Sequence, residues 1–500
     1  MTAIIFICFT LYTATLFVVT RVTTRQGNAT SNEAYFRANR KSPWLVVAYG
    51  GIGASLSGVT FMSVPGFVES SAFTYFGVIL GNMIGYMLVA LILLPLYYKM
   101  NLTSIYVYLN RRIGYWAQRT GSSFFFVSRL LGSALRMYLV VYVLYEFSFK
   151  AMGIPFWIPA VLFIVIILLY TLRGGIRVII WTDMLQTTFM LVATLMTLYF
   201  ILKEVDLSFF SFLKSATNEG YTKLLETDWR AGNFYLKQVL SGIFLTIALN
   251  GLDQDMIQKN LSCRTLKDAQ KNVFTLSVSL IVVNLLFLLL GAALLYYAKN
   301  TGFTLPDNPD SIFPAIAFNL SNVTMILFII GLLAAGYSSA DGTLTALTTV
   351  ICYDFLGFPN DDKHGLIADK DKTKVRKIVH ILCAMLFLCV IILFRHFHDE
   401  SLIKTILSIA SISYGPLLGM FCFGLFTKWT INPLYEKYIP IIAVLAPTIS
   451  YFLKLYSPIL FNGYQFGFEL LIINGLLTFI GMCLLIKKNK NLNSVSQGQF

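Results

Sequence analysis

Hydrophobic runs long enough to cross a membrane recur along the whole chain. A helix needs about 20 mostly apolar residues to span the ~30 Å hydrocarbon core of a bilayer. Because backbone polar groups have no water partner in lipid, each run is predicted to be helical. The 500-residue sequence is therefore predicted to fold as an all-α polytopic membrane protein. About thirteen transmembrane helices are predicted, at residues 2–20, 44–66, 73–98, 122–149, 155–172, 178–202, 237–258, 273–298, 323–353, 375–395, 402–427, 437–454 and 467–486.

The positions of the basic residues predict an orientation. No Lys or Arg precedes the first run, and Arg21 follows it, which argues against a cleaved signal peptide and for a retained helix with its N-terminus outside. Alternation from there places 26 Lys and Arg in inside segments and 10 in outside segments, five of these ten in the long loop 203–237. Positive charge accumulates on the cytoplasmic side of membrane proteins. We therefore predict a plasma-membrane protein whose tail, residues 488–500, is cytoplasmic.

Composition removes several other classes of protein. The chain is 57% hydrophobic and 12% charged, whereas soluble domains carry about 25% charged residues. This excludes a single soluble domain and a disordered chain, and the net charge of +14 reflects membrane topology rather than nucleic-acid binding. The seven cysteines form no CxxC pair and do not combine with the four histidines at metal-ligand spacing. With no HExxH motif or phosphate loop, we predict that the chain is not an enzyme.

The second apolar run contains a stretch rich in glycine, serine and threonine, residues 50–60. Each glycine costs a helix about 1 kcal/mol. The stretch either unwinds and frees carbonyl oxygens for a cation, as in the broken helices of secondary transporters, or allows close packing of helices through small residues. Both interpretations remain open from the sequence.

Two other runs carry groups that suit a cation. In the ninth run Ala335, Ser338 and Ser339 share one helix face, and hydroxyl and carbonyl oxygens are the ligands that hard cations, including Na⁺, prefer. Asp341 lies at the edge of this face, either as a protonated partner in a helix–helix hydrogen bond or as a second cation or proton site. Asp183 opens the sixth run, either as a carboxylate at a helix N-terminus or as a cation ligand.

Arg136 lies at the centre of the fourth run, seven residues after Arg129. An unpaired arginine at this depth costs at least ~3 kcal/mol. Arg136 therefore needs an anion, either a protein carboxylate such as Asp341 or Glu69 or a substrate carboxylate held by both arms of the guanidinium. Arg129 is expected to reach a loop or the membrane interface. Further polar side chains occur in the seventh and eleventh runs. Each one alone is expected to form an ordinary helix–helix hydrogen bond, whereas together they could line a shared cavity: Thr246, Asn250, Ser408, Ser411 and Ser413.

Several short motifs resemble one family in their order and spacing. They are Tyr35-Phe36 before the second run, Ser-Ile-Tyr-Val-Tyr-Leu at 104–109, Thr-Leu-Arg-Gly-Gly at 171–175 running into Thr-Asp-Met-Leu-Gln at 182–186, Gly-Leu-Asp-Gln at 251–254 with Gln258, and Ser338-Ser339 leading to Tyr353-Asp354. With these motifs the chain resembles the sodium:solute symporter family over essentially its whole length.

The resemblance implies a fold and a coupling ion. It implies a LeuT-like fold with two inverted five-helix repeats, residues 44–203 and 237–428, one helix before them (1–20) and two after (436–487). Some members hold a second sodium between an aspartate and three serines. Here Asp183 and Ser338 match, but Asp341 and Gly342 stand at the other two positions, so Asp341 either replaces the hydroxyls or binds a proton. The transported ion implied is Na⁺, held by the carbonyls of Gly53, Leu56 and Ala335 and the hydroxyls of Ser338 and Ser339.

The resemblance also suggests a substrate. Leu56-Ser57-x-x-Thr60 with Arg136 is similar to the sialic acid carriers, whereas the Asn and Gln of the sugar carriers are absent, with Thr246 and Ser408 near those positions. The expected function is Na⁺-coupled import of a small organic solute by alternating access, with an anionic sugar or carboxylate such as sialic acid as the solute. A neutral sugar, an amino acid, an inorganic anion or an ion channel are the alternatives. A lipid bilayer is the expected environment, and a monomer without nucleic acid the expected state. The expected substrate residues are Ser57, Thr60, Arg136, Thr246 and Ser408.

Overall fold

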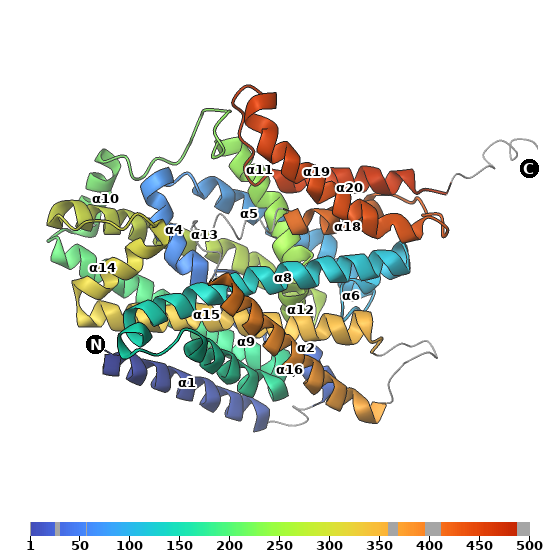
Figure 1. Cartoon of the computed structure of the whole chain (residues 1–500), viewed down its shortest axis with the longest axis horizontal. Helices are drawn as coiled ribbons and strands as arrows, with labels where there is room; N and C mark the ends of the chain where they lie inside the picture. Colours follow the sequence, from blue (N-terminus) through green and yellow to red (C-terminus); the bar gives the residue numbers. More distant parts are fainter. Residues whose placement is uncertain (1, 26–30, 57, 359–368, 396–411, 488–500) are drawn as a thin grey trace, which may run out of the picture.

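The computed structural model describes residues 2–25, 31–56, 58–358, 369–395 and 412–487, which form a bundle of helices (Figure 1). The first half contains α1 (Thr2–Arg25), α2 (Asn32–Arg37), α3 (Trp44–Ser55), α4 (Gly58–Ser71), α5 (Phe76–Leu88), α6 (Leu94–Lys99), α7 (Val107–Arg112), α8 (Tyr115–Leu144), α9 (Trp157–Glu204) and α10 (Phe209–Asn218). The second half contains α11 (Tyr235–Thr246), α12 (Gln254–Leu261), α13 (Leu266–Thr301), α14 (Ile312–Leu320), α15 (Asn322–Val350), α16 (Asp369–Phe394), α18 (Gly415–Phe426), α19 (Ile439–Leu460) and α20 (Leu470–Leu484). Short π-helical segments extend four of them: η2 (Val89–Leu93), η3 (Tyr145–Phe149), η5 (Ile247–Gly251) and η7 (Ile351–Phe355).

The thirteen predicted apolar runs all overlap helices of the bundle. Eight helices in the described ranges are long and apolar enough to cross a membrane, and two bent helix pairs also qualify. Three shorter apolar helices, Trp157–Leu172, Gly415–Phe426 and Leu470–Leu484, match the remaining runs. Residues 402–411 of the eleventh run lie outside the described residues. The all-helical prediction is confirmed, whereas the exact number of membrane crossings stays a prediction.

Burial separates central helices from peripheral ones. In α15, 78% of the most apolar window is buried, against 17% in α1 and 22% in α19. Figure 1 shows α15 in the middle of the molecule, with α1 along one side and α19 and α20 along the opposite side. The outward side chains of the peripheral helices, such as Leu11 of α1 and Leu455 of α19, are apolar and more than half exposed. This is the arrangement expected when the peripheral helices face lipid and α15 does not.

A sharp break in α9 separates the fifth and sixth predicted runs. Helical hydrogen bonding continues past Gly175, but this residue has φ +50° and ψ −142°, which is a non-helical conformation that favours glycine. A Cβ atom there would lie 2.4 Å from the carbonyl oxygen of Tyr35. Gly175 therefore supplies both the turn and the close approach of α2.

Two helices of the bundle are interrupted in mid-span. The pair α3 and α4 is bent by 53° between Ser55 and Thr60, in the glycine-rich run. The pair formed by α11 with η5 and by α12 is bent by 65° between Gly251 and Gln254, and this second interruption was not predicted from the apolar pattern. Each broken helix opens one of the two predicted repeats, which supports the 5+5 arrangement. The repeat boundaries at 44–203 and 237–428 stay predictions.

The two ends of the bundle carry different segments. α10 and α14, from segments predicted to lie outside, are at the same end as the beginning of α1, whereas α6 leads to the opposite end, where α20 finishes (Figure 1). The predicted sorting of loops into two groups is therefore compatible with the bundle. Which end faces the cytoplasm stays a prediction.

Candidate cation and substrate site

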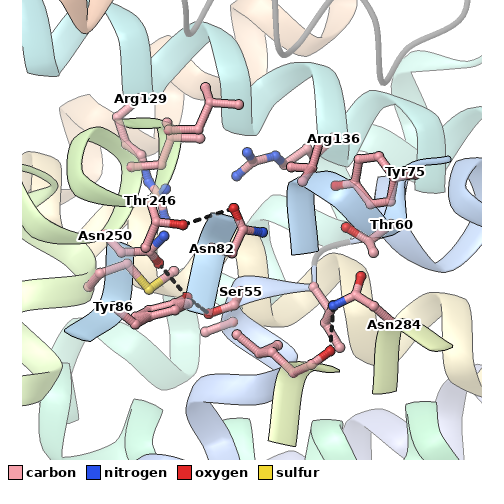
Figure 2. Close-up of a pocket in the computed structure, with 17 residues that line it drawn as sticks. Ser55, Thr60, Tyr75, Asn82, Tyr86, Arg129, Arg136, Thr246, Asn250 and Asn284 are labelled. Atoms are coloured by element: carbon pink, nitrogen blue, oxygen red, sulfur yellow. Dashed lines mark hydrogen bonds between the residues drawn. The ribbon is translucent and has the colours of Figure 1, made fainter. Parts of the chain in front are cut away.

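A cavity of about 130 Å³ opens beside the first helix break, lined by α3, α4, α5, α8, α11 and α13. An engineered protein cavity of about 150 Å³ binds benzene, so this volume suits a small organic molecule and exceeds the space that a lone dehydrated ion needs. Figure 2 shows polar side chains entering the cavity from several of these helices. The cavity is therefore the candidate solute site.

Three of the five predicted substrate residues meet in this cavity. Thr60 at the start of α4, Arg136 in α8 and Thr246 at the end of α11 all line it. Ser57 and Ser408 lie outside the described residues. The sequence placed these side chains on three separate runs, and the fold brings the described three together around one volume.

Arg136 directs its guanidinium group into the cavity (Figure 2). Its Nε atom is buried and has no hydrogen-bond partner among the described residues, and Arg136 forms no ion pair within them. The two carboxylates predicted as alternative partners do not serve, because Glu69 is exposed and Asp341 is bonded elsewhere. The described part of the chain therefore places no carboxylate within ion-pair distance of Arg136.

Arg129 behaves differently, and its expected place at a loop or membrane interface is wrong. Its side chain is only 5% exposed and is paired with Asp253 at 3.3 Å and, more closely, with Asp255. Both carboxylates lie where α12 begins, and Asp253 caps that helix by accepting from the backbone N–H groups of Asp255 and Met256. The apolar pattern could not reveal this, because it showed no interruption before α12.

Amide and hydroxyl groups form another wall of the cavity. The Asn82 amide lies 2.9 Å from the Thr246 hydroxyl, and Tyr86 donates to the side-chain oxygen of Asn250 at 3.0 Å. Ser55 lies 3.2 Å from the Tyr86 hydroxyl. Of these residues, Ser55, Asn82 and Tyr86 were not predicted as site residues. A signal existed, since Asn82 is the only side-chain amide in the apolar run 73–98 and lies four residues before Tyr86, on the same face.

The predicted cation ligands in the second run lie at the end of α3. The stretch 50–60 is interrupted, as the first interpretation requires, but Gly50, Gly51 and Gly53 all stay in α3, which ends at Ser55. The interruption follows them. Gly53 lies in the last turn of α3, and Leu56 lies in the break itself. Because the last carbonyls of a helix lack intrahelical partners, the carbonyl oxygens here are suited to bind a cation.

The glycines also allow close packing of helices, which is the second interpretation of this run. A Cβ atom on Gly50 would lie 2.9 Å from the Cβ of Asp183, and one on Gly53 would lie 2.5 Å from the Thr187 hydroxyl oxygen. Thr187 in turn accepts from the backbone N–H of Gly53 at 3.0 Å. Both interpretations of the run therefore apply, with packing along the helix and the break at its end.

The predicted ligands of the ninth run are buried in the middle of α15. Ala335, Ser338 and Ser339 are at most 2% exposed. The Ser338 hydroxyl donates to Asp183 at 2.6 Å, which leaves its oxygen lone pairs available to a cation. The Ser339 hydroxyl is buried and has no hydrogen-bond partner among the described residues. A buried hydroxyl without a partner is costly, and a cation ligand is one role that removes this cost.

Asp183 is the point where α3, α9, α12 and α15 meet. It lies nine residues after Gly174, where the second part of α9 begins, and is 1% exposed. The interpretation as a helix N-terminal carboxylate is therefore wrong, because that effect is confined to the first turn. Its second oxygen lies 2.9 Å from the ammonium group of Lys259, which also lies 3.5 Å from Asp255. Lys259 follows the seventh predicted run, 237–258, and lies buried in α12.

Asp341 stands apart from this ion pair. Its two carboxylate oxygens accept hydrogen bonds from Tyr170 at 2.9 Å and from the backbone N–H of Gly342 at 2.6 Å. Asp341 thus has donors for both oxygens without a cation. Its predicted role as a second cation or proton site stays a prediction.

Known proteins are similar to this chain over most of its length. The model of the sodium:solute symporter family matches residues 35–432. The sodium/sialic acid symporter SiaT of Proteus mirabilis is 25% identical over 403 residues, which cover 79% of each chain. The sodium/sialic acid symporter NanT of Aliivibrio fischeri is 23% identical over 409 residues, covering 80% of this chain and 78% of NanT.

Solved structures agree with the fold. A Na⁺-coupled sialic acid symporter in a substrate-bound outward-open state superposes with a TM-score of 0.80 at 20% identity, covering 97% of this chain and 99% of the other. The nucleobase-cation-symport-1 family transporter Mhp1 has a TM-score of 0.56 at 16% identity, covering 91% and 96%. The LeuT-like fold is confirmed, and a membrane transporter, not an enzyme, is the class of protein that these likenesses share. With its matched region extending over most of its length, this multi-pass chain belongs to the sodium:solute symporter family and couples the movement of a solute to Na⁺.

Proposed function

We propose that the chain imports an anionic sugar or other small carboxylate, such as sialic acid, together with Na⁺ by alternating access. The observation that carries this proposal is the guanidinium of Arg136 in the cavity, which forms no ion pair within the described residues and whose buried Nε lacks a hydrogen-bond partner there. Arg129 also lines the cavity but is already paired with Asp253 and Asp255, which leaves Arg136 as the charged lining side chain without an ion pair in the described residues. A solute that brings a carboxylate neutralises Arg136 through two parallel hydrogen bonds.

The rest of the cavity suits a polyhydroxylated solute. Thr60, Asn82 and Thr246 offer hydroxyl and amide groups, and the Tyr86–Asn250 pair offers further donors and acceptors. These neutral groups can bond sugar hydroxyls without adding charge. The sialic acid symporters among the relatives support this choice over a simple monocarboxylate.

For the coupling ion we propose the predicted ligands, the carbonyls of Gly53, Leu56 and Ala335 with the hydroxyls of Ser338 and Ser339. Two observations support this set: the buried hydroxyl of Ser339 has no hydrogen-bond partner among the described residues, and α3 ends at Ser55. Such neutral oxygen ligands suit a hard cation, and the bound Na⁺ is cargo that enters and leaves with the solute.

The break between α3 and α4 provides the coupling. Gly53 and Leu56 lie on its cation side, and Thr60, a few residues later, lines the solute cavity. Na⁺ bound at the break therefore fixes the position of Thr60 and lowers the cost of ordering the solute pocket. By linkage, the solute tightens Na⁺ binding by the same factor.

For the setting we propose a monomer in the lipid bilayer of the plasma membrane, with the N-terminus outside and the C-terminus in the cytoplasm. The distribution of Lys and Arg supports this orientation. The separation of α10 and α14 from the end to which α6 leads supports it as well.

The experiment is uptake into proteoliposomes under an inward Na⁺ gradient, with K⁺ replacing Na⁺ as the blank. N-acetylneuraminate should accumulate, and its uncharged methyl ester should not compete with it. In the variant Arg136→Lys we expect at least about tenfold less uptake, because a point charge does not replace the bidentate fork. Arg111→Lys, at an exposed arginine of α7, is the matched control and should behave as the wild type.

Two results would contradict this function. The first is equal competition by the ester and the acid, which would show that the carboxylate is not recognised. The second is an equal loss of uptake by Arg136→Lys for charged and neutral solutes alike, which would make Arg136 a structural residue.

A further inference from the structure

Lys259 occupies an unexpected place for a lysine. It lies in α12 with its side chain 5% exposed, and its ammonium group contacts Asp183 at 2.9 Å and Asp255 at 3.5 Å. A lysine buried to this degree is rare without anionic partners, and taking an ammonium ion out of water costs several kcal/mol. Its position is therefore set by the two carboxylates.

The ion pair belongs to a chain of alternating charges. From Asp183 the contacts run to Lys259, on to Asp255, then to Arg129 and finally to Asp253. Every carboxylate in this chain contacts at least one cationic side chain. Lys259 is the only cationic side chain that contacts Asp183 in the described residues.

Both oxygens of Asp183 are engaged. One accepts the Ser338 hydroxyl at 2.6 Å, and the other faces the Lys259 ammonium group. An ion that used Asp183 as a ligand would have to displace the ammonium group, which has the same charge as Na⁺ and is attached to the chain. Attachment makes its effective concentration high and prevents its release with the cargo.

We infer that the ammonium group of Lys259 takes the place of a second coupling cation at Asp183, so that one Na⁺ accompanies each solute molecule. This inference rests on the proposed function, because it needs the Na⁺ site formed by the break in α3 and by α15. In this arrangement Lys259 determines the ion stoichiometry. It also keeps Asp183 neutralised when the carrier returns without cargo, which a released Na⁺ cannot do.

The test counts ions bound to the purified protein. Equilibrium binding of radioactive Na⁺ to the wild type should saturate at one ion per chain, and the ratio of Na⁺ to N-acetylneuraminate taken up by proteoliposomes should also be one. Lys259→Met removes the ammonium group at similar side-chain volume and leaves Asp183 without a cation. We expect this variant to bind two Na⁺ ions.

Two further variants isolate the cause. In the double variant Asp183→Asn with Lys259→Met both charges are removed, and the count should return to one. Lys267→Met removes an exposed lysine near the start of α13 and should leave the count at one. If Lys259→Met does not yield folded protein, the number of Na⁺ ions bound by the wild type and its ratio of Na⁺ to solute uptake still show whether one or two ions are coupled.

The outcomes separate this inference from the proposed function. Two Na⁺ ions on the wild type, or a single ion on a folded Lys259→Met protein, overturns the role of Lys259 while Na⁺ coupling stands. Absence of any saturable Na⁺ binding and of any Na⁺-dependent uptake in the wild type overturns the proposed function itself.

Discussion

Arg136 and Arg129 lie two helical turns apart on α8 and have opposite fates. Arg129 is neutralised by Asp253 and Asp255, whereas Arg136 extends into the cavity with a buried Nε that lacks a partner among the described residues. A guanidinium left without an anion in an apolar setting is expensive. Under the proposed function this cost is offset when a solute with a negative charge occupies the cavity, so we expect Arg136 to select for anionic solutes.

Ser339 is the residue through which the cation site can be tested most directly. Its hydroxyl is buried and lacks a partner in the described residues, so its removal in Ser339→Ala costs no protein hydrogen bond that the structure shows. We expect the Na⁺ concentration for half-maximal uptake to rise about tenfold, the effect of losing roughly 1.4 kcal/mol of binding. The measurement is the Na⁺ dependence of uptake in proteoliposomes.

The control for this variant is another buried hydroxyl without a partner. The Ser277 side chain of α13 is 2% exposed, and its hydroxyl also has no hydrogen-bond partner among the described residues. Ser277 belongs to neither proposed site. Ser277→Ala should leave the Na⁺ dependence unchanged. A Ser339→Ala protein with the wild-type Na⁺ dependence would remove Ser339 from the cation site.

The sequence allowed some of these residues to be predicted and not others. Arg136, Ser338 and Ser339 were found because each is a polar group inside an apolar run. The Asp183–Lys259 pair could not be found in that way. Lys259 follows an apolar run, where a lysine is ordinarily solvated, and only the bend before α12 places it beside Asp183.

The helix α3 combines two functions that its glycines make possible. It packs against α9 closely enough that a Cβ atom on Gly50 would meet Asp183 and the backbone nitrogen of Met184, and it ends at the break beside the cavity. The close packing holds the end of the helix in place, so that the carbonyl groups of its last turn have a fixed position. Sequence composition showed that the glycines matter but could not distinguish packing from unwinding.

Gly50→Ala tests the packing. The added methyl group would lie 2.9 Å from the Asp183 Cβ and 3.1 Å from the Met184 nitrogen, so the helices must separate, at a cost of about 1–3 kcal/mol. We expect a lower midpoint of thermal unfolding in detergent. Gly132→Ala in α8 is the matched control, because a Cβ atom there meets nothing within 4 Å and alanine favours helices. A Gly50→Ala protein as stable as Gly132→Ala would contradict the packing role.

The whole molecule divides into helices that hold the sites and helices that surround them. The apolar runs predicted nearly all of these helices, because each run reflects only the need to bury or expose apolar surface over the thickness of a bilayer. The tilt and breakage of helices are set by packing between them, as at Gly175 and between Gly251 and Gln254. For that reason the location of the cavity required the fold.

Coupling is a property of the whole molecule and predicts reciprocal stabilisation. Na⁺ at 100 times its dissociation constant should stabilise the folded protein by about 2.7 kcal/mol. N-acetylneuraminate should raise the midpoint of thermal unfolding more in Na⁺ than in K⁺, and Na⁺ should raise it more when the solute is present. Differential scanning fluorimetry in the two salts measures both effects. Purely additive shifts would show that the two ligands bind independently.

The uneven burial of the helices has a consequence for how the protein responds to its surroundings. α1, α16 and α19 leave most of their apolar surface exposed, where lipid is expected to contact them, while α15, with its two serines, is enclosed by protein. Changes in acyl-chain length therefore act first on the outer helices, which can tilt to match a thinner or thicker bilayer. The proposed cation site is insulated from such changes, so we expect solute selectivity to persist across membranes in which the speed of turnover differs.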